Sequence, residues 1–153
     1  MAKLTVKYFS ECLARQTTFE MYLPNDVREN PWAQEENPYR KRPMKTLFLL
    51  HGYTGSADNY VPEYLSEQYN FAVIAPNGEN GFWLDGISTG HKFCTLLGEE
   101  MPDYVHKTFG LANSAEDTYI LGLSMGGFGA LHTGLAYPHR FGKIGAMSSA
   151  LIV

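Results

Sequence analysis

The stretch Gly122-Leu123-Ser124-Met125-Gly126-Gly127 decides the fold of this 153-residue chain. A short apolar run, residues 118–122, comes directly before Ser124, and a stretch of small and apolar residues, 125–137, follows it and stops before a proline. Serine with glycine two positions away on each side, between a buried strand and a helix, predicts a very sharp turn. Such a turn holds the serine in a strained backbone conformation and leaves no room for side chains at the two glycines.

The turn also predicts chemistry. It lifts the hydroxyl of Ser124 above the edge of the sheet and places the backbone N–H of Met125 in the first turn of the helix, where the positive end of the helix dipole favours a developing oxyanion. We therefore predict that Ser124 is a nucleophile and that Met125 donates one hydrogen bond of an oxyanion hole. A glycine-rich turn with an incidental serine is the alternative, and the flanking strand and helix argue against it.

A second loop fits the same chemistry. His51-Gly52-Tyr53 follows a predicted strand over residues 46–50. In sites of this type the second oxyanion donor comes from such a loop, so we predict that it is the backbone N–H of Tyr53. Gly52 is expected to give the backbone the freedom to turn that N–H toward the pocket. His51 is interpreted as a histidine that braces the loop, because the catalytic base of such sites follows the nucleophile in the sequence.

The remaining pattern predicts an α/β fold in one domain over residues 1–153, with a mostly parallel sheet and flanking helices. Continuous apolar runs without alternation are typical of strands buried on both faces, and alternating runs of strands exposed on one face. Residues 25–43, with three prolines, are expected to form a loop. Pro102 is expected either to kink the predicted helix over residues 93–109 or to divide it into two shorter helices. The predicted strands are residues 4–9, 17–23, 46–50, 71–75, 118–122 and 144–147, and the predicted helices are residues 59–68, 93–109 and 125–137.

Several motifs resemble one known family. Leu49-Leu50-His51-Gly52, Ala75-Pro76-Asn77-Gly78, Asn80-Gly81-Phe82-Trp83 and the Ser124 region are similar to the esterase D and tributyrin esterase group, which includes S-formylglutathione hydrolases and feruloyl esterases. The resemblance implies an α/β-hydrolase fold and hydrolysis of small carboxylic esters through an acyl-enzyme, with no metal or cofactor. It also implies that Trp83, and with it Asp85, borders the active-site cleft; the sequence alone favours a core position for Trp83 equally.

Two alternatives to a small-ester hydrolase stay open at this point. The first is a related acyl hydrolase that acts on a thioester of the S-formylglutathione type or on feruloyl or acetyl groups of polysaccharides. The second is a binding protein that has kept the hydrolase fold without its chemistry. The Ser124 region does not separate these alternatives, because the substrate pockets of such folds are built largely from other loops.

The residues after Ser124 do not complete a catalytic triad. They include His132 and His139 and neither Asp nor Glu, whereas the order in this fold is serine, acid, histidine. His132 lies eight positions along the same predicted helix, about 12 Å from Ser124 along the axis. We therefore expect the chain to be the N-terminal part of a hydrolase domain that is incomplete at its C-terminus and inactive by itself. A second copy or a complementing C-terminal fragment is expected to cover the unpaired sheet edge.

Composition excludes other classes of partner. The net charge is -4 and the pI about 5.7, so the chain lacks the basic surface that nucleic acid requires, and Arg40-Lys41-Arg42 is expected to be a solvated loop. No apolar run approaches the roughly 18 residues of a membrane span. Cys12 and Cys94 do not have the spacing of a metal site, and we expect reduced thiols in a cytoplasmic protein.

Overall fold

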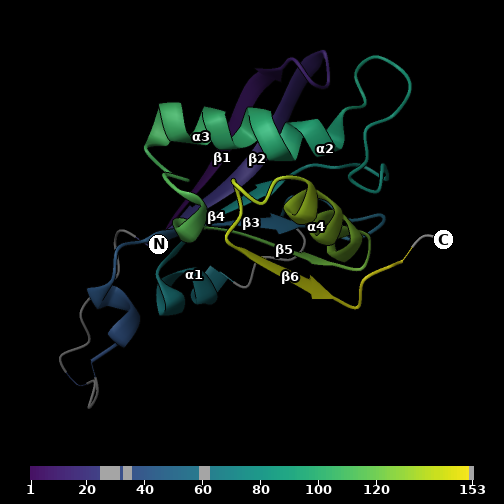
Figure 1. Cartoon of the computed structure of the whole chain (residues 1–153). Coiled ribbons are helices and arrows are strands. Elements are labelled where there is room, and N and C mark those ends of the chain that lie inside the picture. Colours follow the sequence, from purple (N-terminus) through teal and green to yellow (C-terminus); the bar gives the residue numbers. More distant parts are fainter. Residues whose placement is uncertain (25–31, 33–35, 59–62, 152–153) are drawn as a thin grey trace.

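The computed structural model describes residues 1–24, 32, 36–58 and 63–151. Its centre is a six-stranded sheet in the order β1-β2-β4-β3-β5-β6 (Figure 1). Every predicted strand is present and extends the predicted range by one to three residues, so the sequence patterns are confirmed. The strands are β1 (Ala2–Ser10), β2 (Arg15–Leu23), β3 (Lys45–Leu50), β4 (Phe71–Pro76), β5 (Thr118–Leu123) and β6 (Lys143–Met147).

The sheet is mixed and mostly parallel. β4, β3, β5 and β6 run parallel to one another, and their apolar runs are the continuous ones. β1 and β2 form an antiparallel hairpin that joins the sheet through an antiparallel pairing of β2 with β4. In the parallel part, Leu50 lies opposite Gly122, so the loops after β3 and β5 leave the sheet side by side at its carboxyl edge. The predicted α/β-hydrolase architecture is therefore present.

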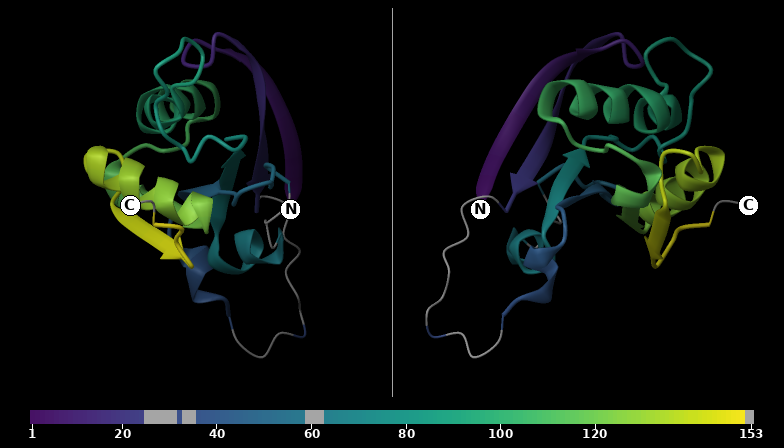
Figure 2. Two further views of the ribbon diagram at one scale, coloured as in Figure 1. Left: turned by 90° about the vertical axis from the view of Figure 1, so that its right-hand side faces the viewer. Right: turned by 60° about the vertical axis from the view of Figure 1, so that its left-hand side comes forward.

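Helices cover both faces of the sheet (Figures 1 and 2). α1 (Glu63–Tyr69) lies on one face, where Ser66 donates a hydrogen bond of 2.7 Å to the carbonyl oxygen of Phe71. The other face carries the larger core, which includes residues of α2 (Phe93–Thr95), α3 (Met101–Phe109) and α4 (Met125–Ala136). The predicted helix over residues 59–68 is confirmed in its second half, and its residues 59–62 lie outside the described residues.

The segment from α2 to α3 is helical throughout but is divided into two α-helices, as one of the two expectations had it, and the division falls just before Pro102. A five-residue π-helical turn, Leu96–Glu100, joins the two α-helical parts. In it the N–H of Met101 bonds to the carbonyl oxygen of Leu96. Pro102 then stands in the first turn of α3, where a residue without an N–H is tolerated because its donor has no required intrahelical partner. The π turn absorbs the irregularity that a proline inside one regular helix produces.

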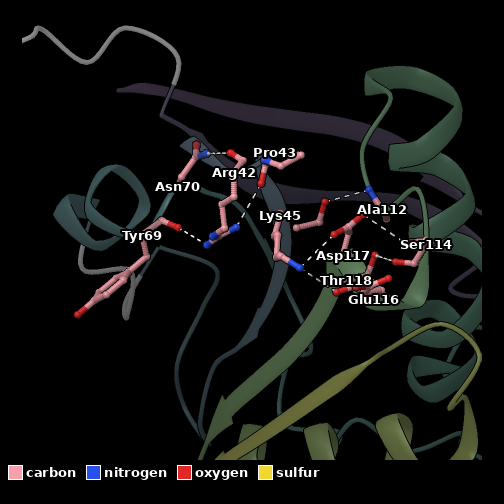
Figure 3. Close-up of polar contacts among 11 residues, drawn as sticks. Arg42, Pro43, Lys45, Tyr69, Asn70, Ala112, Ser114, Glu116, Asp117 and Thr118 are labelled. Atoms are coloured by element: carbon pink, nitrogen blue, oxygen red, sulfur yellow. Dashed lines mark hydrogen bonds and ion pairs between the residues drawn. The ribbon is translucent and has the colours of Figure 1, made fainter. Parts of the chain in front are cut away.

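Polar contacts hold the amino-terminal ends of the central strands (Figure 3). Lys45 at the start of β3 pairs with Asp117 at 3.1 Å, and Thr46 accepts a hydrogen bond of 2.9 Å from the N–H of Ala112. The guanidinium of Arg42 donates to the carbonyl oxygen of Tyr69 and lies over the ring of Phe71, 5.0 Å from its centroid. The expectation of a wholly solvated basic loop is therefore wrong at Arg42.

A short 3₁₀ helix also stands within the predicted loop of residues 25–43. It spans Pro38–Lys41 and is capped by the side chain of Asn37, which accepts a hydrogen bond of 2.9 Å from the N–H of Tyr39. Arg40 and Lys41 are exposed, as expected. Proline at the first position of such a helix is favourable because its fixed φ suits a helical start.

Candidate active site

Ser124 has the strained backbone that the sequence predicts. It lies between β5 and α4 with φ 56° and ψ −115°, a conformation that residues with a side chain rarely adopt. Its N–H donates to the carbonyl oxygen of Met147 at 2.9 Å, and its carbonyl oxygen accepts from the N–H groups of Phe128 and Ala150, each at 3.0 Å. These three hydrogen bonds, from β6, α4 and the chain after β6, hold the strain in place.

The two glycines around Ser124 are required by close approach of the backbone. A Cβ atom on Gly122 would lie 2.0 Å from the carbonyl oxygen of Gly126. A Cβ atom on Gly126 would lie 2.1 Å from the carbonyl oxygen of Leu50, the last residue of β3. The turn can therefore bring α4 onto the ends of β5 and β3 only with glycine at both positions. This is the geometry of a nucleophile elbow.

The loop after β3 runs beside this turn. A Cβ atom on Gly52 would lie 3.3 Å from the carbonyl oxygen of Leu123 and 3.5 Å from the Cβ atom of Ser124. The expected role of Gly52 as a source of backbone freedom needs correction, because the positive φ of 63° in this loop belongs to Thr54. Glycine is needed at position 52 because a side chain there would crowd Ser124. The turn itself is closed by a hydrogen bond of 3.0 Å that the N–H of Gly55 donates to the carbonyl oxygen of Gly52.

The two predicted oxyanion donors differ in exposure: Tyr53 is 56% exposed and Met125 is 0% exposed. Within the part of the chain that the structure describes, no hydrogen bond uses either N–H. Tyr53 follows Gly52, and Met125 follows Ser124 as the first residue of α4. Both donors thus belong to the two backbone segments that meet at the half-buried Ser124. Two unused donors beside one serine are what an oxyanion hole requires.

His51 braces the loop after β3 as a neutral imidazole. Its Nε2 accepts a hydrogen bond of 2.9 Å from the N–H of Gly78, so Nδ1 carries the proton and donates to the carbonyl oxygen of Gly52 at 2.8 Å. Burial lowers the pKa of His51, which favours the neutral form. The structure supports the interpretation of His51 as structural, since both ring nitrogens are occupied by the backbone.

Trp83 and Asp85 have structural positions. Trp83 is 0% exposed, packs its indole edgewise on the His51 ring with centroids 5.1 Å apart, and donates its N–H to the carbonyl oxygen of His51 at 3.3 Å. The carboxylate of Asp85 accepts hydrogen bonds from the N–H of Thr95 at 3.0 Å and from its hydroxyl at 2.6 Å. Trp83 is therefore a core residue and not an exposed residue of a pocket, and Asp85 holds the start of the α2–α3 helix. That Asp85 borders the active-site cleft stays a prediction.

The other histidines make contacts away from Ser124. Nδ1 of His132 lies 3.5 Å from the sulfur of Cys94, and its ring stacks on that of Phe128 at 5.8 Å. His106 contacts the carbonyl oxygen of Leu111, and His91 and His139 lie beside aromatic rings. Among the described residues, none of these contacts involves Ser124. The prediction that His132 does not serve Ser124 is in line with this placement.

Two asparagines of the site were missed by the residue-by-residue analysis. The side-chain oxygen of Asn80 accepts the N–H of Thr54 at 2.8 Å, and that of Asn77 accepts the N–H of Ala57 at 2.9 Å. Asn77 also donates to the carbonyl oxygen of Thr18 on β2 at 3.1 Å. Both residues stand in Asn-Gly pairs after β4, a turn signal that places amide side chains next to backbone groups and that could have indicated this role.

A shallow hollow of about 280 Å³ is lined by residues of the loop after β4 and does not include Ser124, so it is separate from the chemistry at the elbow. Its lining residues are Gly81, Leu84, Gly86, Ser88, His91 and Phe93. Over the described ranges, no three His, Cys, Asp or Glu side chains gather in a way that could hold a metal ion. None of the described helices has the length and apolar character needed to cross a membrane.

Comparison with known proteins agrees with this geometry. Residues 10–152 match the model of the Esterase family, described as "Putative esterase". The chain belongs to the Esterase family. The match covers the elbow, the loop after β3 and strands β2 to β6, and it includes only the last residue of β1. It confirms the resemblance seen in the sequence.

Relatives of this Esterase family chain are hydrolases. An acetyl esterase of Caldicellulosiruptor saccharolyticus is 37% identical over 100% of this chain and 58% of its own length. An S-formylglutathione hydrolase of Paracoccus denitrificans is 26% identical over 93% of this chain and 55% of its own length. The solved structure of FphF, a fluorophosphonate-binding serine hydrolase of Staphylococcus aureus, superimposes with a TM-score of 0.79 at 27% identity, over 97% of this chain and 57% of that one. The chain therefore spans a little over half the length of the relatives it matches.

Proposed function

We propose that the protein containing this chain hydrolyses carboxylic esters, with Ser124 as the nucleophile. The observation that carries the proposal is the strained serine at φ 56° beside two unused backbone donors, the N–H groups of Tyr53 and Met125. Strain of this kind costs about 1–3 kcal/mol and persists where the surrounding structure enforces it, commonly at functional sites. A turn that only connected a strand to a helix would not need a serine in this conformation.

The arrangement supports acyl transfer in two steps. The Ser124 hydroxyl oxygen attacks the ester carbonyl carbon while its proton passes to a base, and the carbonyl oxygen becomes an oxyanion that the N–H groups of Tyr53 and Met125 stabilise. The alcohol takes the proton and leaves, and water then releases the acid from the acyl-serine by the same route in reverse. One oxyanion donor typically contributes about 3–4 kcal/mol to the stabilisation of such a transition state.

The base is proposed to come from sequence outside residues 1–153. Serine hydrolases of this fold use a histidine that a carboxylate orients, in the order serine, acid, histidine. Residues 125–153 contain neither Asp nor Glu, and the contacts of His132 are with Cys94 and Phe128. The proposal therefore assigns residues 1–153 the nucleophile and the oxyanion hole, and assigns the proton transfer to other residues of the protein.

The proposed substrate class is small acyl esters, acetyl esters first. This is supported by the acetyl esterase that is 37% identical along the whole chain. A thioester of the S-formylglutathione type is the second candidate, supported by the relative that is 26% identical. Esters and thioesters share the same attack at a carbonyl carbon, so Ser124 and its two donors serve either substrate.

Labelling with a fluorophosphonate tests the nucleophile directly. In the full-length gene product we expect modification at Ser124, and we expect Ser124→Ala to abolish both labelling and hydrolysis of p-nitrophenyl acetate. Ser88→Ala, a change in an exposed loop serine, is the matched control and should leave both unchanged. Comparison of kcat/KM for an acetyl ester and for S-formylglutathione separates the two substrate classes. A well-folded full-length protein that neither labels nor hydrolyses either substrate would indicate a non-catalytic binding protein.

A further inference from the structure

Three aromatic side chains from three different segments form a row beside the elbow. The ring centroid of Phe82 lies 6.1 Å from that of Tyr53 and 6.1 Å from that of Phe128. Tyr53 belongs to the loop after β3 and Phe128 to the first turn of α4, where its N–H bonds to the carbonyl oxygen of Ser124. We call Tyr53, Phe82 and Phe128 the aromatic row. Its two outer members are therefore fixed to the two backbone segments that meet at Ser124.

Phe82 is held in the row by an unusual backbone. Phe82 and Trp83 are consecutive residues with positive φ, 52° and 58°, a region that aromatic residues avoid. The buried indole of Trp83 contacts the His51 ring and donates to the His51 carbonyl oxygen, and this anchors the pair. With this backbone, the two adjacent side chains have different surroundings. Trp83 is fully buried, whereas Phe82 is half-buried between the rings of Tyr53 and Phe128. Observed strain of this kind motivates a search for a function of the residue that it positions.

The row is open to solvent. Tyr53 is 56% exposed, and Phe82 and Phe128 are each partly exposed. At centroid separations of 6.1 Å the rings already contact one another, so a further ring fits across their open side and not between them. Exposed aromatic rings that are grouped beside a reactive serine form a surface suited to a flat apolar group.

We propose that the aromatic row binds an aromatic ring of the ester substrate and makes aromatic esters better substrates than saturated ones of the same size. This inference rests on the proposed ester hydrolysis at Ser124 and adds a specificity-determining surface to it. The ring belongs either to the acyl group or to the leaving alcohol, and both sources offer the same planar π face. Ring–ring contacts of this kind correspond to an advantage of about two- to ten-fold over a saturated ring.

Two matched substrate pairs test the row in the full-length gene product. Phenyl acetate against cyclohexyl acetate places the ring in the alcohol, and methyl benzoate against methyl cyclohexanecarboxylate places it in the acid. We expect Phe82→Leu and Phe128→Leu each to lower the aromatic-to-saturated ratio of kcat/KM in one pair by about two- to ten-fold. Comparison of each variant with wild type cancels the different intrinsic reactivities of the esters. The affected pair identifies the source of the ring.

Phe9→Leu is the control, because Phe9 is a 57% exposed aromatic residue on β1 and leaves the aromatic row intact. Its ratios should equal those of wild type. Unchanged ratios in both pairs for both Phe82→Leu and Phe128→Leu, in protein that hydrolyses the esters, would overturn the inference and leave the proposed function standing. If no ester is hydrolysed, the proposed function fails, and saturation-transfer NMR with phenyl acetate and cyclohexyl acetate still tests the row. An equal ratio of saturation transfer to phenyl acetate and to cyclohexyl acetate from wild type and from Phe82→Leu would then reject the row.

Discussion

The Nε2 atom of His51 accepts a hydrogen bond of 2.9 Å from the backbone N–H of Gly78, so a side chain after β3 is tied to the loop after β4. The hydrogen bond requires Nε2 without a proton, and burial lowers the pKa of His51 accordingly. Protonation at Nε2 turns this acceptor into a donor that faces another donor. The state of one imidazole therefore controls how the loop that carries Tyr53 is held.

Stability is expected to fall in acid through His51. The pKa of His51 in the folded protein lies below the ordinary 6.5. The contribution of the neutral imidazole to the unfolding free energy is therefore complete above about pH 6.5, and it is lost as the pH falls from 6.5 through the lowered pKa. We expect wild type to lose more unfolding free energy than His51→Gln between pH 7.5 and pH 5, measured by urea denaturation. The other titrating groups are common to both proteins and cancel in the comparison. Equal losses would contradict the assignment of a neutral His51.

A methyl group at Gly126 should be far more costly than one at Gly110. At Gly126 the new Cβ atom would lie 2.1 Å from the carbonyl oxygen of Leu50, which is backbone and has little freedom to move. We expect Gly126→Ala to cost about 3 kcal/mol or more, or to prevent folding. Gly110→Ala is the control: no atom lies within 4 Å, and only its φ of 68° opposes alanine, at about 1–2 kcal/mol. Denaturant midpoints measure both, and equal costs would be evidence against the close approach at the elbow.

Glycine at position 124 should give a more stable protein than alanine. Glycine is usually the less favourable of the two by about 0.5–1 kcal/mol, because it loses more backbone entropy on folding. At φ 56° and ψ −115° the strain of a Cβ atom reverses this order. We expect Ser124→Gly to exceed Ser124→Ala in unfolding free energy by about 1 kcal/mol, with both variants inactive. Chemical denaturation compares them, and a more stable alanine variant would count against strain at this residue.

The thiol of Cys12 is expected to react slowly. Burial and the nearby carboxylate of Glu100 raise the pKa of Cys12 to about 12, against an ordinary value of 9.0. Glu100 accepts hydrogen bonds from the N–H of Cys12 at 2.8 Å and from the Tyr8 hydroxyl at 3.1 Å, which keeps it in place. At pH 8 the thiolate fraction is then about a thousand-fold below that of an unperturbed thiol, and alkylation by iodoacetamide slows in proportion.

The alkylation rate is best measured in a Cys94→Ala background, which leaves Cys12 as the single thiol. Removal of the negative charge by Glu100→Gln should lower the Cys12 pKa and raise the rate. The denatured protein supplies the rate of an unperturbed thiol under the same conditions. Native protein that reacts as fast as denatured protein would rule out the proposed environment of Cys12.

Most of the fold could be predicted from the sequence because it depends on short-range patterns. The apolar runs of β3, β4, β5 and β6 are continuous, which indicates parallel strands. The expected burial on both faces is seen in β4 but not in β6, where every residue is exposed or partly exposed. At the elbow, Gly122 and Gly126 are visible in the sequence and are also what the close approach of the backbone requires. A Cβ atom on either would lie only 2.0 or 2.1 Å from a carbonyl oxygen. Local patterns of this kind predict the geometry because the residues that it requires lie within a few positions of one another.

The rest depends on contacts between distant segments. Whether Trp83 faces the core or a pocket is decided by the positive φ of two consecutive residues and by packing on His51, and neither appears in a residue pattern. The helix accommodates Pro102 by a π turn and not by a kink. The choice between the two depends on packing against distant segments, which a residue pattern does not show. The side chain of Arg42 is not wholly solvated as expected, because its guanidinium donates a hydrogen bond to the carbonyl oxygen of Tyr69, which is distant in the sequence.

The hydrogen bonds of the Ser124 backbone to Met147 and Ala150 connect the proposed nucleophile to β6, the edge strand of the sheet that the described residues form. Met147 ends β6, and Ala150 lies three residues beyond it, so the serine is tethered at two points to the sheet boundary. A displacement of β6 is transmitted to Ser124 through bonds of 2.9 and 3.0 Å without passing through α4. A chain that pairs with β6 is therefore expected to shift the backbone of the proposed nucleophile, because β6 is bonded to Ser124 as directly as α4 is.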